Sequence, residues 1–181
     1  NDKYYMDSAS RTSTERVLIA LKVLTWIVFI GLMVKGGAIV LSYVMTLINP
    51  EGAKNLYMGM DLYAMRQSAL LHFSLTAFFM VALAAMQAYV AYLLIKILAL
   101  VNLHQPFTIG VARILESMSY DLVAIWAVSL VQIAHKAWWA KTDPSPDWGG
   151  GETLFMAGLV FVISQIFKRG VELQSEQDLT V

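Results

Sequence analysis

The chain contains no cysteine among its 181 residues, and only 14% of its residues are charged. The absence of cysteine excludes disulfides, thiolate metal sites and cysteine nucleophiles. Thirteen basic residues balance thirteen acidic ones, a neutrality that is not typical of nucleic-acid-binding proteins. The sequence also lacks the Walker A, G-x-S-x-G, H-E-x-x-H and G-x-G-x-x-G patterns. We therefore predict a non-enzymatic protein with no cofactor and no direct contact to nucleic acid.

Long apolar runs make up most of the remaining sequence. Hydrophobic residues account for 58% of the chain, above the about 45–50% of an ordinary soluble domain. This composition predicts an all-α fold, an integral membrane four-helix bundle forming one transmembrane domain over residues 1–181. The predicted spans cover about residues 17–48, 67–101, 117–139 and 153–169. Turns are predicted at 49–52, 104–108 and 143–151, which hold all four prolines.

Basic residues are distributed unevenly between the two sides of these spans, and this asymmetry predicts the orientation of the chain. Eight of the thirteen lie on the side that holds both termini: Lys3, Arg11, Arg16, Lys22, Lys96, Arg113, Lys168 and Arg169. The opposite side holds four basic residues and a group of boundary tryptophans: Lys54, Arg66, Lys136 and Lys141, with Trp138, Trp139 and Trp148. We therefore predict that both termini lie in the cytoplasm (N-in/C-in).

Two segments depart from the pattern of a simple span. Residues 106–120 alternate apolar and polar side chains, which predicts a short amphipathic cytoplasmic helix before the third span. Lys35-Gly36-Gly37 indicates either a hinge beside a charged gate or the point where the first span leaves the hydrocarbon. We favour the second interpretation, because adjacent glycines lower helix propensity by about 1 kcal/mol each.

Alanines at 82, 84, 85, 88 and 91 predict a helix-packing surface on the second span.

Three ionisable side chains near the ends of the spans are candidates for chemistry. His72 and His135 are expected at similar depth on neighbouring helices, where they suit a haem, metal, quinone or proton site. The simpler interpretation is two interfacial imidazoles that share hydrogen bonds with water and tryptophan. Asp121 is expected to form an ion pair with a base such as Lys22 or Lys96, with a proton or ion relay as the alternative.

The end of the chain carries the most specific pattern. Residues 170–181 follow a basic pair, and their acidic residues are interspersed with a few apolar ones, which predicts a cytoplasmic tail that binds a protein partner. A solvated helix end is the alternative. Together with the predicted surface helix, the candidate partner-binding residues are Arg113, Glu116, Glu172, Leu173, Glu176, Asp178, Leu179 and Val181.

Two stretches resemble a bacterial family of small four-span membrane proteins that has no assigned function. One is the Pro-Phe-Thr turn at 106–108, and the other is the terminal segment Phe167–Val181, with its pattern Arg-Gly-x-Glu-Leu-x-x-Glu-x-Asp-Leu-Thr-Val. Members usually carry an asparagine and a basic run after Pro-Phe-Thr, whereas this chain has Gly110, Val111 and a lone Arg113. No catalytic residues are carried over from this family.

The resemblance implies a bacterial inner-membrane protein and a regulatory partner. Such proteins are often encoded beside a small helix-turn-helix regulator of the Cro/repressor type, so a regulator of this kind is the expected cytoplasmic partner. Two alternatives remain open: a membrane redox or transport component, or an accessory subunit of a larger membrane complex. The four spans also predict contact with the lipid bilayer, and a homo-oligomer is compatible with each of these interpretations.

Overall fold

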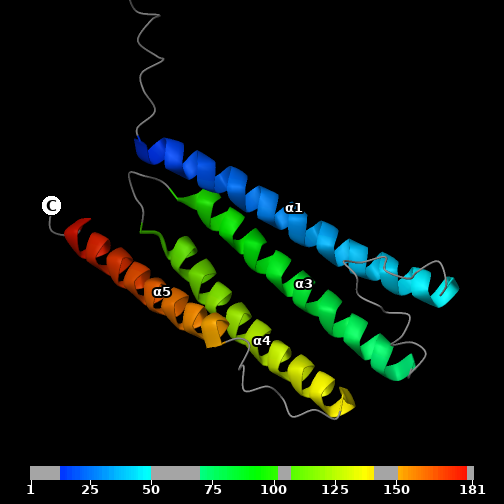
Figure 1. Cartoon of the computed structure of the whole chain (residues 1–181). Helices are drawn as coiled ribbons and strands as arrows, with labels where there is room; N and C mark the ends of the chain where they lie inside the picture. The colour runs from blue at the N-terminus through cyan, green and yellow to red at the C-terminus, as the bar shows by residue number, and fades with distance from the viewer. Residues whose placement is uncertain (1–12, 50–69, 102–106, 141–150, 179–181) are drawn as a thin grey trace, which may run out of the picture.

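The computed structural model describes residues 13–49, 70–101, 107–140 and 151–178, and their secondary structure is entirely α-helical. Four long helices account for these residues: α1 (Ser13–Ile48), α3 (Leu70–Leu100), α4 (Ile109–Ala140) and α5 (Gly151–Asp178) (Figure 1). The prediction of an all-α protein with four apolar helices is confirmed. Outside the described residues lie the chain start, most of the predicted turns, and the predicted partner-binding residues Leu179 and Val181.

The helices pack as an open bundle in the order of the chain. In the described part, α1 packs on α3, α3 on α4 and α4 on α5, and no other pair of helices is in contact. Neighbouring helices run in opposite directions, so that the start of α1 and the end of α5 lie at the same end of the molecule (Figure 1). The core is therefore three successive helix–helix interfaces, with α1 and α5 at the two edges.

All four helices are long and apolar enough to cross a membrane. The candidate spans are Glu15–Ile48, Leu70–Leu100, Ile109–Trp139 and Glu152–Glu176, which makes the chain a multi-pass membrane protein. Many large apolar side chains on these helices are exposed, as expected where lipid replaces water. Some hydroxyl groups within the spans bond to their own helix: Thr25 donates to the Leu21 carbonyl oxygen at 2.8 Å, and Thr46 to that of Ser42 at 2.7 Å. Such bonds satisfy polar groups that lipid cannot.

Small residues bring α1 close to α3. A methyl group placed on Gly36 would lie 3.7 Å from the Ala84 side chain, which is ordinary van der Waals contact. Nearer the end of α1, the Tyr43 ring stacks on the Phe73 ring of α3 with centroids 5.0 Å apart. The Tyr43 hydroxyl oxygen lies 3.2 Å from the Ser74 hydroxyl oxygen. Three alanines of the predicted strip are buried within the chain: Ala84, Ala88 and Ala91. The strip is thus largely occupied by packing inside this molecule.

The structure describes both segments that depart from the pattern of a simple span. Helix α1 continues through Lys35-Gly36-Gly37 to Ile48, the end predicted for the first span, and Gly36 faces Ala84 of α3. The structure also shows no separate amphipathic helix before the third span. From Ile109 onward, the segment predicted to form it is the first part of α4, which continues to Ala140.

Candidate functional site: the C-terminal groove

Thr108 fixes the chain where it enters α4. The backbone N–H of Val111 donates to the Thr108 side-chain oxygen at 3.3 Å, and the N–H of Ala112 donates to the Thr108 carbonyl oxygen at 3.1 Å. The first bond satisfies an amide that a helix start otherwise leaves unpaired, and the second is the first i→i−4 bond of the helix, so Thr108 acts as the N-cap of α4. The residue before the cap, Phe107, is thereby held at a defined place against α5.

Phe107 packs directly over Gly170 of α5. A methyl group placed on Gly170 would lie 2.7 Å from the nearest carbon of the Phe107 ring, a distance that carbon atoms do not adopt. The ring also meets Phe167 edge-on, with centroids 5.2 Å apart and an interplanar angle of 62°. Glycine at position 170 is therefore what allows the aromatic ring to lie on the helix.

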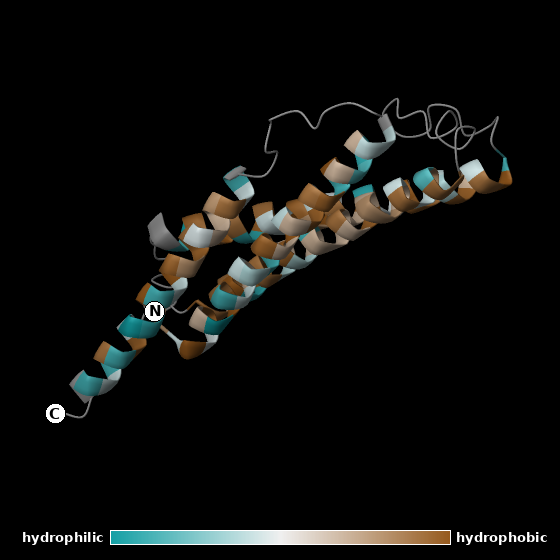
Figure 2. Ribbon diagram, turned by 90° about the horizontal axis from the view of Figure 1, so that it is seen from below, coloured by the Kyte–Doolittle hydropathy of each residue, from teal (hydrophilic) through white to brown (hydrophobic). Residues whose placement is uncertain are grey.

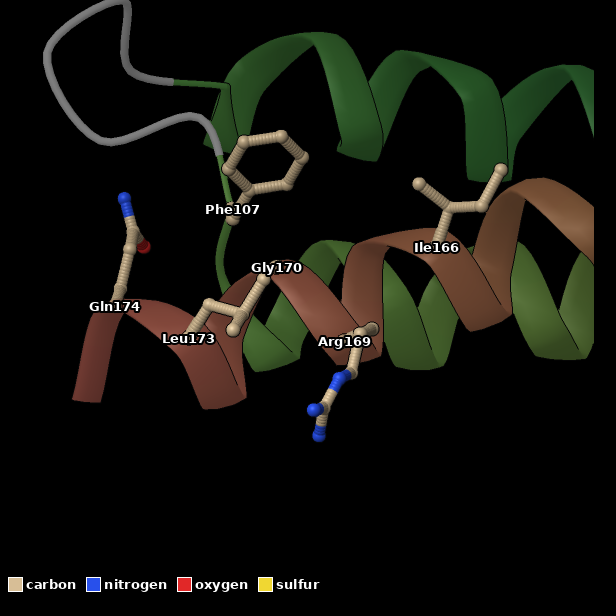
Figure 3. Close-up of a pocket in the computed structure, with 6 residues that line it drawn as sticks. All are labelled: Phe107, Ile166, Arg169, Gly170, Leu173 and Gln174. Carbon is tan, nitrogen blue, oxygen red and sulfur yellow. The ribbon is translucent and has the colours of Figure 1, made fainter. Parts of the chain in front are cut away.

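A groove opens beside this contact, and we call it the C-terminal groove. It has a volume of about 430 Å³ and is lined by Phe107, Ile166, Arg169, Gly170, Leu173 and Gln174. Figure 3 shows the Phe107 ring above α5, with the Arg169 side chain directed away from it. The floor of the groove is consequently apolar, and charge is confined to its rim.

Two ion pairs lie near the groove. The Lys168 ammonium on α5 lies 2.9 Å from the Glu116 carboxylate on α4, and their side chains are 33% and 27% exposed. The Arg169 guanidinium lies 2.6 Å from the Glu172 carboxylate one turn along α5, where both side chains are largely exposed. The first pair joins two helices, whereas the second lies on a single helix.

The last turns of α5 are hydrophilic and project past the ends of the neighbouring helices (Figure 2). Glu172 and Glu176 are exposed there, and Leu173 is 47% exposed despite its apolar side chain. The predicted tail is therefore helical as far as Asp178.

The structure distributes the predicted partner-binding residues over two helices. Glu172, Leu173, Glu176 and Asp178 lie together on the end of α5. Arg113 is exposed on α4. Glu116 on α4 is paired with Lys168 on α5 in this structure.

The structure also brings His72 and His135 together, at the opposite end of the molecule. Their rings lie 4.9 Å apart between centroids, and Trp139 stacks on His72 at 4.6 Å with an interplanar angle of 5°. The Nδ1 atoms of both imidazoles are buried and have no hydrogen-bond partner in the described part of the chain. A polar ligand would satisfy these atoms.

The spacing of the two imidazoles does not fit axial ligands on opposite faces of a haem. In such a pair each ligating nitrogen lies about 2 Å from the metal, and the centre of each imidazole ring lies about 1 Å beyond its nitrogen. The two ring centroids are then roughly 6 Å apart. The observed separation is 4.9 Å. Among the described residues, no group of three or more His, Cys, Asp or Glu side chains could hold a metal ion.

The predicted ion pair of Asp121 is not formed. Lys22 lies on α1, which does not pack on α4, and the Lys96 ammonium lies 4.8 Å from the centre of the Tyr92 ring on its own helix. One carboxylate oxygen of Asp121 is buried without a hydrogen-bond partner in the described residues. Among the described residues, the lysine that forms an ion pair between helices is Lys168, and its partner is Glu116.

Sequence reasoning missed the contact between Phe107 and Gly170. The available signal was that both residues belong to the two stretches that carry the family resemblance, 106–108 and 167–181. Spacing could not connect stretches so far apart, because which faces of two helices meet is set by packing along their whole interface. The structure joins them through the antiparallel packing of α4 and α5.

Comparison with known proteins gives one match. The family described as "Protein of unknown function (DUF2975)" matches residues 49–181, which include α3, α4, α5 and both stretches that form the groove. No curated protein matches the chain. No solved structure matches it either.

Proposed function

The chain belongs to the DUF2975 family of proteins of unknown function, and from this premise we propose that it recruits a cytoplasmic protein to the membrane. In this proposal the protein is non-enzymatic and lies in the bacterial inner membrane with both termini inside. Its binding surface is the C-terminal groove together with the acidic end of α5.

The observation that carries the proposal is the meeting of Phe107 with Gly170. Each residue lies in a stretch that resembles the family, and the contact builds a groove rather than closing the surface. The lining is apolar while its rim is charged, which is the usual composition of a protein-binding surface. Leu173 lines the groove and is exposed. Its side chain would be the main apolar contact that this protein offers to the partner.

The charge of this surface supports a basic partner. Glu172, Glu176 and Asp178 lie on the projecting end of α5, and complementary charge speeds encounter and fixes orientation. A small helix-turn-helix regulator, the partner class implied by the family resemblance, carries basic residues where it holds DNA. Binding at the membrane would therefore compete with binding to DNA.

The test is capture of a purified small helix-turn-helix regulator of the Cro/repressor type by the full chain in detergent. We expect the full chain to retain the regulator, and a chain shortened by residues 170–181 to lose it. Leu173→Ser and Glu176→Lys, which alter exposed side chains, are each expected to weaken capture about tenfold or more. Glu152→Lys changes an exposed acid at the other end of α5 and serves as the matched control.

Equal capture by the full chain, the shortened chain and the two point variants would overturn the proposal. Loss of capture in Glu152→Lys as well would mean that net charge, rather than this surface, decides binding. Circular dichroism of each variant separates loss of binding from loss of the helices.

A second function, a membrane redox or transport component, is favoured by the two unsatisfied imidazole nitrogens of His72 and His135. Their spacing supports hydrogen bonding to a polar ligand such as a quinone. Quinone retained during purification and lost on His72→Ala would support this function. A purified protein that carries no quinone and takes none from mixed micelles would count against it.

A further inference from the structure

A polar cavity lies between three helices in the apolar part of the molecule. It has a volume of about 380 Å³, and its lining comes from α1, α3 and α4. The polar side chains in that lining are Lys35, Thr76, Gln87, Gln132 and Lys136. A cavity with convergent polar groups among apolar walls is the usual form of a small-ligand site.

The charge in this cavity is not balanced. Among the described residues, its lining holds two lysines and no aspartate or glutamate. In the residues that the structure describes, neither lysine has a carboxylate within 4.0 Å, since both ion pairs there involve other residues. The Thr76 hydroxyl is also buried without a hydrogen-bond partner among those residues.

The position of Lys35 makes this imbalance costly. Its neighbour Gly36 faces Ala84, near the middle of α3 (Leu70–Leu100), so Lys35 lies deep along the spans. A charged side chain at that depth is unfavourable, and it normally lines a cavity or pairs with an opposite charge. Lys136 lies near the end of α4, so the cavity extends from mid-span toward that end.

We propose that this cavity binds the phosphate group of an anionic membrane lipid. Lys35 and Lys136 would neutralise the phosphate, and the amides of Gln87 and Gln132 would donate hydrogen bonds to its oxygens. The acyl chains would lie along the exposed apolar side chains of the spans. This site is separate from the C-terminal groove and does not depend on the partner proposed there.

The test compares lipid retention by native mass spectrometry after reconstitution in phosphatidylcholine vesicles with or without phosphatidylglycerol. Wild-type protein is expected to retain phosphatidylglycerol, and Lys35→Gln and Lys136→Gln to retain it roughly tenfold less. Lys22→Gln on α1 and Arg113→Gln on α4 remove exposed charges outside the cavity lining and should retain it as the wild type does. Lys35→Arg keeps the charge and should retain it too, which separates loss of the site from loss of folding.

A second arm identifies the source of the phosphate. Inorganic phosphate is added to the lipid-free protein in an uncharged detergent, and the unfolding temperature is followed. Suppose that phosphate raises the unfolding temperature of the wild type but not of Lys35→Gln or Lys136→Gln, and that phosphatidylglycerol is not retained selectively. The site then binds the free ion, and the lipid proposal is overturned. Lipid retention that is equal in wild type and both glutamine variants overturns it as well.

Discussion

Gly170 and Phe107 form a contact that depends on the size of one side chain. The Phe107 ring occupies the space where any larger residue at position 170 would place its Cβ atom. Glycine in a helix interior normally costs about 1 kcal/mol relative to alanine. At this position the helix accepts that cost because the ring then packs on α5 and on Phe167.

Gly170→Ala is therefore expected to destabilise the protein by roughly 1 kcal/mol. The overpacking penalty of about 1–3 kcal/mol exceeds the gain in helix propensity. Gly158→Ala is the matched control, because Gly158 lies on the same helix and nothing lies within 4 Å of its added methyl group. That variant should be stabilised by up to about 1 kcal/mol.

The measurement is unfolding of both variants in mixed micelles of an uncharged detergent and dodecyl sulfate. Opposite signs for the two alanines are the expected result. If both substitutions stabilise the protein alike, the Phe107 ring moves aside freely and the groove has no fixed wall.

At the residue scale, sequence could identify which side chains were unusual but not which ones meet. His72 and His135 were predictable neighbours, since each lies near the same end of adjacent antiparallel spans. The surroundings of Asp121 could not be predicted in the same way, because the partner of an ionisable group depends on helix rotation. Rotation is set by packing along the whole interface, and no single residue encodes it.

Helices α4 and α5 are joined by both packing and charge. The Lys168–Glu116 pair lies between them, and both side chains are about two-thirds buried. Arg169 and Glu172 form a pair of similar distance on α5 alone, in a far more exposed position. The two pairs provide a comparison of interhelical and local ion pairing within a few residues.

A double-mutant cycle on Glu116→Gln and Lys168→Gln is expected to give a coupling free energy of about 1 kcal/mol. The Arg169–Glu172 cycle should give a smaller coupling, because water screens that pair more fully. Both cycles are measured by unfolding at low and high salt. A larger coupling for the exposed pair would show that charge contributes little to the packing of α4 on α5.

At the scale of elements, the apolar runs predicted the existence and order of the helices. They placed the end of α1 at Ile48 and the start of α4 less well. Residues 106–120 were separated from the third span by their lower hydrophobicity, whereas α4 begins at Ile109. There the N-cap at Thr108 outweighed the local signal.

The orientation of the whole molecule can be tested because the chain has no cysteine. Single cysteines introduced at Ser175 and Trp138 would be the only thiols present. Ser175 is exposed near the end of α5, and the Trp138 side chain is 86% exposed near the end of α4. With both termini in the cytoplasm, a membrane-impermeant thiol reagent should label Trp138→Cys in intact spheroplasts.

The same reagent should label Ser175→Cys only after the membrane is opened or inverted. A matched control is Ser164→Cys, whose position is buried within α5 and should stay unlabelled in both preparations. Labelling of Ser175→Cys in intact spheroplasts would reverse the orientation and place the C-terminal groove outside the cell.

The open order of the helices has a mechanical consequence. The described helices form three interfaces connected in series, from α1 to α3 to α4 to α5. In a closed ring of helices, one interface can fail while the others still hold every helix in place. In a series, the failure of a single interface separates the molecule into two parts. The interface between α1 and α3 is the one whose failure leaves α3, α4 and α5 together, and these are the helices within the family match. The edge helix α1 can therefore detach or exchange its neighbour while the helices that build the groove stay assembled.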